Sequence, residues 1–423
     1  MTEQKQNIKI YKYVLCLIIP IILGIILLNA VYLLPAKNVE KHVVDAFSFF
    51  YDRSFAEEGY EPSLLEQRDD FTDLIILTNC FARRPEDPFY KAALRGTYIG
   101  YLMDTNDPLH DVYHPFYGML YYTFFGSGYS YADYSRYWHG YQVILIPLFE
   151  VFGYKTVIAL NYILFFTLSA AAVVIAAKCY GILRGAAYAG MIISLSPVVI
   201  PMCLQYSAMA YITLISSIIF CLIKKDENIP LLFMSVGTAT AYFDFLTYPA
   251  LALCVLCTLY IIEFLNKKNA LQIIKSLFAF SFLWALGYGV MFVAKWVITA
   301  AVLGGNEFSY ALSSAIFRVN GAGYSILDAL TALKDTLAET AALPVLGAAL
   351  LMTAASLLYA LKQKETKFCG VRLMLFLIPP AITLAWFLVI RNHSIQHKFL
   401  SVRNCAAIWF ALFSLVSSIK TSN

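Results

Sequence analysis

Apolar runs close to 20 residues long recur along the chain and constrain its fold more than any other sequence feature. Each run is long enough to cross the ~30 Å hydrocarbon core of a bilayer as a helix. Only 14% of the residues are charged, whereas soluble proteins carry about a quarter. We therefore predict an all-α polytopic membrane protein with about ten transmembrane helices, at 13–34, 156–177, 186–203, 208–223, 230–246, 248–264, 276–298, 342–361, 372–390 and 405–419.

Basic residues predict the sidedness of these spans. Lys5, Lys9 and Lys12 precede the first run, so the amino terminus is expected in the cytoplasm. The short Lys- and Arg-rich loops fall on the same side only if residues 229–265 cross the bilayer twice. The break between those crossings is expected at 243–249, because a proline disfavours helix in the residue before it. This arrangement predicts a multi-pass protein of the plasma membrane.

The predicted spans divide the chain into five regions. They are the first transmembrane helix (1–34), a long extracytoplasmic loop (35–154), a transmembrane core (155–300), a second extracytoplasmic loop (301–341) and the C-terminal transmembrane helices (342–423).

Two amphipathic helices are expected within the long first loop, at 64–82 and 136–152. The second is interpreted as an interfacial helix bent near Pro147, with a re-entrant half-span as the alternative. Residues 309–340 of the second loop are expected to form another element that lies on the bilayer.

Composition excludes several other functions. The net charge of +4 is spread over the loops and forms no basic face, so nucleic acid is not expected as a partner. Cys254 and Cys257 form a CxxC motif inside an apolar run, where small apolar filler is a better interpretation than a redox or zinc site.

Carboxylates in the first loop are the candidate catalytic groups. Asp70 and Asp73 lie three positions apart and are expected to share the polar face of the 64–82 helix. A carboxylate within hydrogen-bond reach of a hydroxyl can take its proton while that oxygen attacks a sugar. The alternative is a pair of solvated acids that favour the helix dipole. Asp244 differs, because an ionisable group at the end of an apolar span usually has a partner or a function.

Cationic and imidazole groups are the candidates for binding a phosphate or another part of the substrate. Lys295 lies near the outer end of the 276–298 run, where it can hold a lipid phosphate or extend to the headgroups. His393 and His397 are one turn apart if helical, but no HExxH-like companion supports zinc, so no metal ligand is predicted. The remaining candidates are Arg136, His139 and Arg403.

Several motifs occur in a recognisable order. Asp70-Phe-Thr-Asp73 follows the first span, and an aromatic run with a central proline extends from Tyr141 to Phe152-Gly153. A basic turn at 178–184 and Leu195-Ser196-Pro197 come next. In these features the chain resembles the GT-C superfamily of integral-membrane glycosyltransferases, which includes protein mannosyltransferases and aminoarabinose transferases. The chain is also similar to uncharacterised bacterial GT-C-like membrane proteins in the segments 137–141, 243–249, 295–296 and 392–404.

The chain departs from the characterised enzymes in two ways. Their loop acid usually lies soon after the first span and is often Asp-Glu, whereas here the acids come some 35 residues later. The sequence also stops just after its last apolar run.

The resemblance implies an inverting transfer of a sugar from a polyprenyl-phosphate donor to an extracytoplasmic acceptor. Asp70 or Asp73 would act as the base, and Lys295, His393, His397 and Arg403 would offset charge on the departing phosphate. A divalent cation is compatible with this chemistry and is not required. The alternatives are a lipid or glycan transporter or flippase, and a catalytically inactive membrane scaffold. The concentration of polar residues at the outer boundary favours the transferase over a transporter.

Overall fold

The fold is mostly helical, as seen in a computed structural model. It describes residues 2–56, 61–103, 112–223, 226–320, 323–341, 347 and 374–419. One expected span, 342–361, lies outside these residues apart from position 347.

Among the residues that the structure describes, five helical segments are long and apolar enough to cross a bilayer. They are Ile10–Tyr32 within α1 (Thr2–Tyr32), α7 (Tyr154–Tyr180), α9 (Leu204–Leu222), α12 (Ala270–Leu303) and the segment Lys398–Ser418. The last comprises α19 (Lys398–Ser401), η3 (Val402–Asn404) and most of α20 (Cys405–Ile419). These segments indicate a multi-pass membrane protein.

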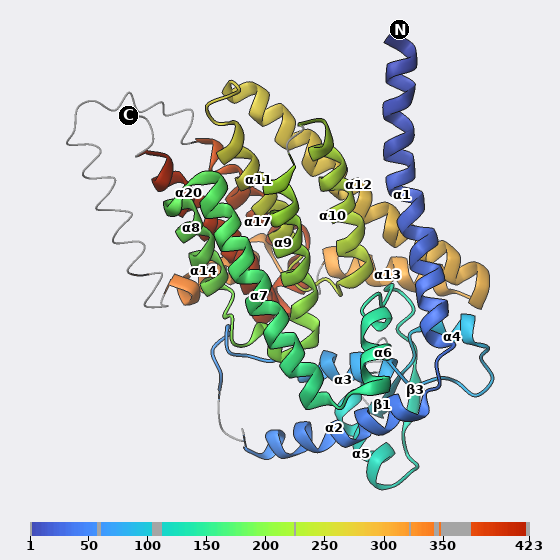
Figure 1. The fold of residues 1–423 in the computed structure, drawn as a ribbon. Coiled ribbons are helices and arrows are strands. Elements are labelled where there is room, and N and C mark those ends of the chain that lie inside the picture. The colour runs from blue at the N-terminus through green and yellow to red at the C-terminus, as the bar shows by residue number, and fades with distance from the viewer. Residues whose placement is uncertain are drawn as a thin grey trace.

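Four shorter apolar helices pack among the long ones to form what we call the bundle (Figure 1). They are α8 (Ile182–Ser194), α10 (Ile229–Phe243), α11 (Ala250–Phe264) and α17 (Ile378–Val389). The chain breaks between α10 and α11 where the sequence predicted, because α11 starts only after Pro249. Nearly every residue of α11 is buried, which explains why its sequence is apolar on all sides.

Glycines let α10 and α12 approach closely. A Cβ atom added to Gly237 would lie 2.1 Å from the carbonyl oxygen of Trp284, and one added to Gly287 would lie 2.4 Å from that of Met234. Any side chain at these positions would push the two backbones apart. Small residues at a helix crossing are a common basis of packing inside membranes, where dispersion forces must replace the hydrophobic effect.

The residues between α1 and α7 form a separate layer at one end of the bundle, which we call the α2–α6 segment (residues 37–151; Figure 1). Its helices are α2 (Lys37–Ala56), α3 (Asp70–Asn79), α4 (Phe89–Arg95), α5 (Pro115–Phe124) and α6 (Gln142–Val151). Strands β1 (Tyr98–Met103), β2 (Val112–His114) and β3 (Ser130–Ala132) form an antiparallel sheet in the order β2-β1-β3. The expectation of an all-α chain was wrong here, because these strands are too short to show a clear period of two.

The two helices expected in this segment are shorter than predicted. α3 covers only residues 70–79 of the expected 64–82. It begins there because Asp69 accepts a hydrogen bond from the backbone N–H of Thr72 (3.0 Å) and caps the helix. α6 contains Pro147 as expected and begins after a turn at 139–141.

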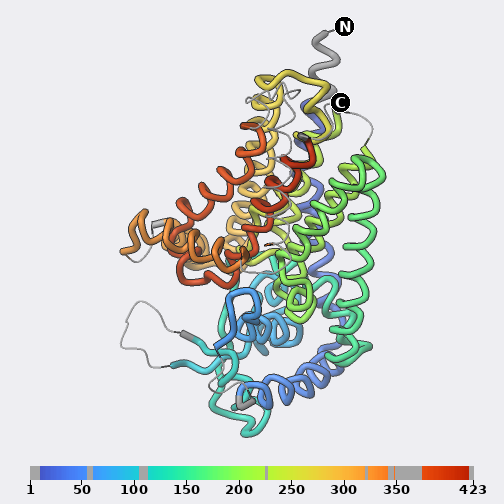
Figure 2. Tube along the Cα trace, turned by 90° about the vertical axis from the view of Figure 1, so that its left-hand side faces the viewer, coloured from blue at the N-terminus to red at the C-terminus, as the bar shows by residue number. Residues whose placement is uncertain are grey.

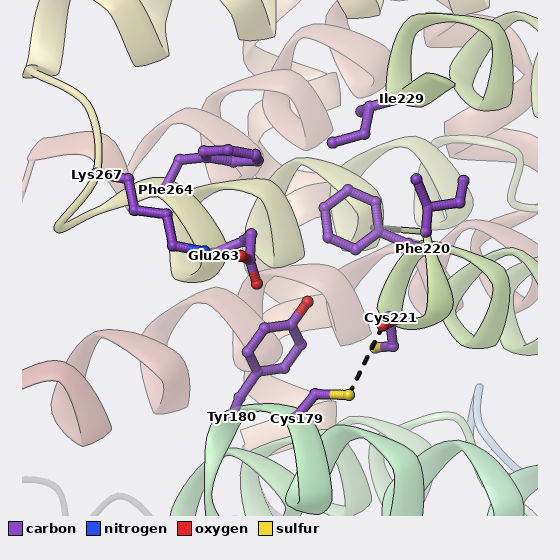
Figure 3. A pocket seen from close by; sticks show the side chains of 9 residues that line it. Cys179, Tyr180, Phe220, Cys221, Ile229, Glu263, Phe264 and Lys267 are labelled. Atoms are coloured by element: carbon purple, nitrogen blue, oxygen red, sulfur yellow. Dashed lines mark hydrogen bonds and ion pairs between the residues drawn. The ribbon is translucent and has the colours of Figure 1, made fainter. Parts of the chain in front are cut away.

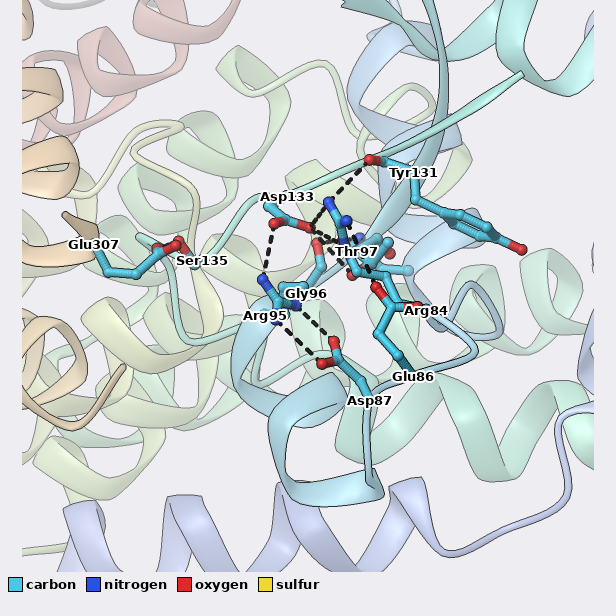
Figure 4. Close-up of polar contacts among 11 residues, drawn as sticks. Arg84, Glu86, Asp87, Arg95, Gly96, Thr97, Tyr131, Asp133, Ser135 and Glu307 are labelled. Atoms are coloured by element: carbon cyan, nitrogen blue, oxygen red, sulfur yellow. Dashed lines mark hydrogen bonds and ion pairs between the residues drawn. The ribbon is translucent and has the colours of Figure 1, made fainter. Parts of the chain in front are cut away.

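Ion pairs hold the sheet of the α2–α6 segment against α4 (Figure 4). Arg95 contacts Asp87 at 2.6 Å and Asp133 at 3.0 Å. Arg84 contacts Asp133 at 3.1 Å. Asp133 therefore joins two guanidinium groups from different parts of this segment, and all four side chains are largely shielded from solvent.

Two amphipathic helices occupy the region where 309–340 was expected to lie on the bilayer. They are α13 (Glu307–Asn320) and α14 (Ile326–Ala341), and they project to one side of the bundle (Figure 2). Their exposed side chains include Phe308, Leu312, Ile316 and Leu327. Helix α18 (Arg391–Gln396) packs against α13 and α14.

Candidate active site where the α2–α6 segment meets the bundle

The start of α3 places three carboxylates within five residues, and each has a different environment. Asp69 is buried and caps α3. Asp70 is 38% exposed at its side chain and forms an ion pair with Arg53 of α2. Asp73 is completely enclosed. The expectation that Asp70 and Asp73 share a polar face was therefore wrong, because α3 also packs against α9 on the side that carries Asp73.

Asp73 joins α3 to the first turn of α9. Its two carboxylate oxygens accept backbone N–H groups of Leu204 (3.2 Å) and Gln205 (3.1 Å). These N–H groups have no partner within their own helix, and the helix dipole favours an anion there. Burial, together with the nearby charge of Asp69, nevertheless raises the pKa of Asp73 to about 7. Asp73 is thus both a structural cap and an acid that titrates near neutral pH.

Asp69 is a candidate that the sequence interpretation missed. Burial raises the pKa of its carboxyl group, while the hydrogen bond to Thr72 and the positive charge of Arg403 act in the opposite direction. The sequence did contain a signal, because an aspartate three residues before a threonine at the start of an apolar helical pattern is a common N-cap.

Arg403 connects the last apolar segment to the α2–α6 segment. It is buried, its guanidinium lies 3.8 Å from the centre of the Tyr206 ring, and it donates hydrogen bonds to the carbonyl oxygens of Leu65 (3.3 Å) and Phe399. Its Nε has no hydrogen-bond partner among the described residues. A buried guanidinium with a free donor and no direct carboxylate partner is suited to binding an anion.

Polar atoms that are buried and unpaired concentrate around Arg403. Within the described part of the chain, no hydrogen-bond partner exists for several side-chain atoms from α18 to η3, and the same holds for Gln205 Oε1 at the start of α9. These atoms belong to Asn392, His393, Ser394, Ser401, Arg403 and Asn404. Buried polar groups are almost always hydrogen-bonded, so this concentration indicates a place for a polar ligand or ordered water.

The two histidines of this region are neutral. The rings of His393 and His397 lie 4.8 Å apart, and His397 Nε2 accepts a hydrogen bond from Arg318 of α13 (3.1 Å). Burial lowers the pKa of His397 to about 4, and the charge of Arg318 lowers it further. Burial also holds the pKa of His393 well below its usual value. Arg318 was not among the predicted site residues, because nothing in the sequence places α13 beside α18.

Lys295, His139 and Arg136 form a second group, which fastens the α2–α6 segment to α12. Lys295 is buried and donates to the carbonyl oxygen of Leu94 (2.6 Å), and Trp296 donates to that of Arg136 (3.0 Å). The His139 ring contacts Tyr141 Oη at 2.8 Å and the Tyr134 carbonyl oxygen at 2.7 Å. Among the described residues, no hydrogen bond or ion pair links Lys295 to Asp70 or Asp73.

Asp244 lies between the two groups, and its carboxylate finds its hydrogen-bond donors within its own turn. Its carboxylate accepts the backbone N–H of Thr247 (3.0 Å) and the hydroxyl of the same residue. It thereby stabilises the tight turn between α10 and α11, in which Leu246 adopts a positive φ of 70°. The backbone of Leu246 faces His393, so this turn forms one wall around the unpaired histidine.

The predicted residues therefore do not all enclose one pocket. A cavity of about 390 Å³ lies instead at the end of the bundle away from the α2–α6 segment, where α7 and α9 end and α10 begins (Figure 3). It is lined by Tyr180, Cys179, Cys221, Phe264 and the ion pair of Glu263 and Lys267, among others. No three His, Cys, Asp or Glu side chains in the described residues are grouped so that they could hold a metal ion. No family model, curated protein or solved structure matches the chain.

Proposed function

We propose that the chain is an integral-membrane glycosyltransferase of the GT-C type, which moves a sugar from a polyprenyl-phosphate donor to a hydroxyl group outside the cytoplasm. One observation carries the proposal. The start of α3 holds Asp69 within electrostatic reach of the buried Arg403 and carries Asp70 and Asp73 beside it. Buried polar atoms in residues 392–404 also have no hydrogen-bond partner among the described residues. Sugar transfer from a lipid phosphate needs both a carboxylate base and a pocket for an anionic leaving group.

The proposed topology has ten spans with the amino terminus in the cytoplasm. In this arrangement α8, α10, α11 and α17 cross the bilayer together with the five longer segments. The tenth expected span, 342–361, lies outside the described residues apart from position 347. The α2–α6 segment then lies outside, next to the leaflet from which a polyprenyl phosphate would enter.

The proposed reaction is a single displacement. The acceptor oxygen attacks the anomeric carbon and loses its proton to a carboxylate, the new C–O bond forms, and the bond from that carbon to the phosphate oxygen breaks. The electron pair leaves with the polyprenyl phosphate, and the anomeric centre is inverted. Arg403 would stabilise the negative charge on the departing phosphate, and His393 would hydrogen-bond to it as a neutral imidazole.

Asp70 is the proposed base, because its exposed carboxylate can be reached by an acceptor. Asp73 is the second candidate. Its raised pKa suits proton transfer near neutral pH, but both of its oxygens are engaged by α9. We assign Lys295, Arg136 and His139 to positioning the α2–α6 segment, since their polar atoms contact protein groups.

The test measures transfer in proteoliposomes with synthetic polyprenyl-phosphate glucose, mannose or arabinose and a cell-envelope extract as the acceptor. Polyprenyl phosphate released from the donor is quantified by mass spectrometry. We expect one donor to be consumed, and Asp70→Asn to slow its consumption by roughly 10²- to 10⁴-fold. Asp52→Asn is the matched control, because Asp52 is an exposed acid of α2 next to Arg53.

Each other outcome has a definite meaning. If Asp70→Asn retains full activity and Asp73→Asn loses it without unfolding, Asp73 is the base. If both variants transfer normally, no carboxylate of this motif acts as the base. If none of the donors is consumed, the scaffold alternative is favoured over the transferase.

A further inference from the structure

A continuous row of aromatic rings crosses the surface of the α2–α6 segment, and we call it the aromatic ribbon. Its members come from α3, both strands of the β1–β2 pair, and α5 with its C-cap. In spatial order they are Phe71, His114, Tyr117, Tyr101, Tyr121 and Phe125. Neighbouring ring centres are 4.8 to 6.5 Å apart. Rings from separate elements thus form one row.

Close packing of α5 on β1 aligns this row. A Cβ atom added to Gly118 would lie 2.4 Å from the Cα of Gly100, so the two backbones are in contact. Tyr117 and Tyr121 are four residues apart and therefore on the same side of α5. The contact of α5 with β1 brings the Tyr121 ring parallel to that of Tyr101, at 4.8 Å and 10°.

The ribbon is accessible and uncharged. Phe71, Tyr117 and Phe125 are exposed, and the other members are partly exposed. Burial lowers the pKa of His114, so its imidazole is neutral, and its Nδ1 has no hydrogen-bond partner among the described residues. The ribbon therefore offers ring faces and tyrosine hydroxyls.

We propose that the aromatic ribbon binds a neutral glycan strand, which serves as the acceptor of the transferase. A pyranose has an apolar C–H face that packs on an aromatic ring, and a rim of hydroxyls that tyrosine and imidazole can bond. The spacing of the rings is close to the length of one sugar unit. A neutral glycan strand also suits the ribbon, because none of the six side chains of the ribbon is charged.

The position of the aromatic ribbon favours a glycan strand over a lipid surface as its ligand. α5 lies at the end of the molecule farthest from the start of α1 (Figure 1), so the ribbon is not on the lipid-facing side of the bundle. The row also begins at Phe71, the residue directly after Asp70. A strand lying on the rings would therefore end beside the proposed base. The acceptor role rests on the proposed function, whereas binding of a glycan does not.

The test uses the purified full-length chain and three probes, cellohexaose, chitohexaose and mannohexaose, with dissociation constants measured by saturation-transfer NMR. We expect at least one hexasaccharide to bind, and Phe125→Ala or Tyr121→Ala to weaken it roughly 5- to 10-fold. Phe124→Ala is the matched control. Phe124 is 59% exposed, similar to the 66% of Phe125, but contacts Phe47 and Tyr51 outside the ribbon.

The proposal is overturned if no hexasaccharide binds, or if Phe124→Ala weakens binding as much as Phe125→Ala. It is also overturned if Phe125→Ala reduces binding to phosphatidylglycerol vesicles and leaves hexasaccharide binding unchanged. Asp70→Asn separates the two proposals, since it should bind the hexasaccharide normally while losing transfer. If ribbon variants lose binding and Asp70→Asn still transfers, the glycan site stands and the proposed base does not.

Discussion

The α2–α6 segment and the bundle both bury apolar side chains, but each adds a different kind of contact to that packing. The segment adds directional polar contacts, such as the pairs that Arg84 and Arg95 make with Asp133. The bundle adds close approach of its long helices, as at Gly237 against Trp284. Polar pairs are weakened by salt and sensitive to pH, whereas packing responds mainly to volume. The difference teaches that the two regions should respond to different perturbations, and that the buried polar residues Asp73 and Arg403 lie where the regions meet.

Removal of Arg403 should have the largest effect on stability, because Arg403 joins both regions. We expect Arg403→Ala to lower the free energy of unfolding by about 3–5 kcal/mol, because it leaves a cavity beside Tyr206 and leaves the carbonyl oxygens of Leu65 and Phe399 without their donor. Thermal unfolding in detergent, followed by size-exclusion chromatography, measures the loss. Lys267→Ala is the control, because Lys267 is 60% exposed at its side chain and makes an i,i+4 ion pair and a ring contact with Phe264. Equal melting temperatures for the two variants would contradict a joining role.

The close packing of helices in the bundle is tested at two glycines. Gly237→Ala should destabilise the bundle by about 1–3 kcal/mol, because the new methyl group would overlap the carbonyl oxygen of Trp284. Gly289→Ala on α12 has open space around its Cβ and should be neutral or stabilising by up to about 1 kcal/mol. The difference in melting temperature between the two variants should persist in high salt. A difference that disappears in salt would count against packing as its cause.

The contribution of the ion pairs in the α2–α6 segment is tested at Asp133. Asp133→Asn should cost about 1–3 kcal/mol, because two partly buried guanidinium groups lose their shared charged partner. Limited proteolysis of the α2–α6 segment reports this loss more directly than global unfolding. Protease sensitivity of the wild type should rise with salt, while that of Asp133→Asn should change less. Identical salt responses would mean that these pairs do not stabilise the segment.

A further test concerns how stability depends on pH. The folded pKa of Asp73, about 7, lies above the ~3.9 of an unfolded aspartate, so the folded state holds this proton more tightly. Stability from Asp73 is therefore present below about pH 4 and is lost as pH rises toward 7. Asp73→Asn should remove that component, so its melting temperature should fall less over the same interval. Parallel pH profiles for the variant and the wild type would rule the effect out.

The apolar helices of the bundle could be predicted from the sequence, because the hydrophobic pattern of each helix lies within its own residues. Pro249 marked the break between α10 and α11, and the acidic, basic and apolar pattern of 309–340 indicated a helical element outside the long spans. The strands were missed, because three residues in β2 and in β3 give no reliable alternation.

The site could be predicted only in part, because side-chain burial depends on contacts distant in sequence. Asp73 was predicted as a candidate base from its place in the loop, but its burial comes from α9, 131 residues later. Lys295 resembled a phosphate ligand by residue type and depth, yet its partner is the carbonyl oxygen of Leu94, 201 residues earlier. Arg318 carried no signal at all, since its importance arises from the contact of α13 with α18.

The hydrogen bond from Arg403 to the Leu65 carbonyl oxygen spans 338 residues, and this has a consequence for biosynthesis. While the ribosome is still making the chain, the α2–α6 segment is complete long before its anchoring arginine exists. The segment can therefore reach its final position only after the last helical segment has been made. A truncated translation product should consequently leave the α3 carboxylates less enclosed and be recognised by quality-control proteases.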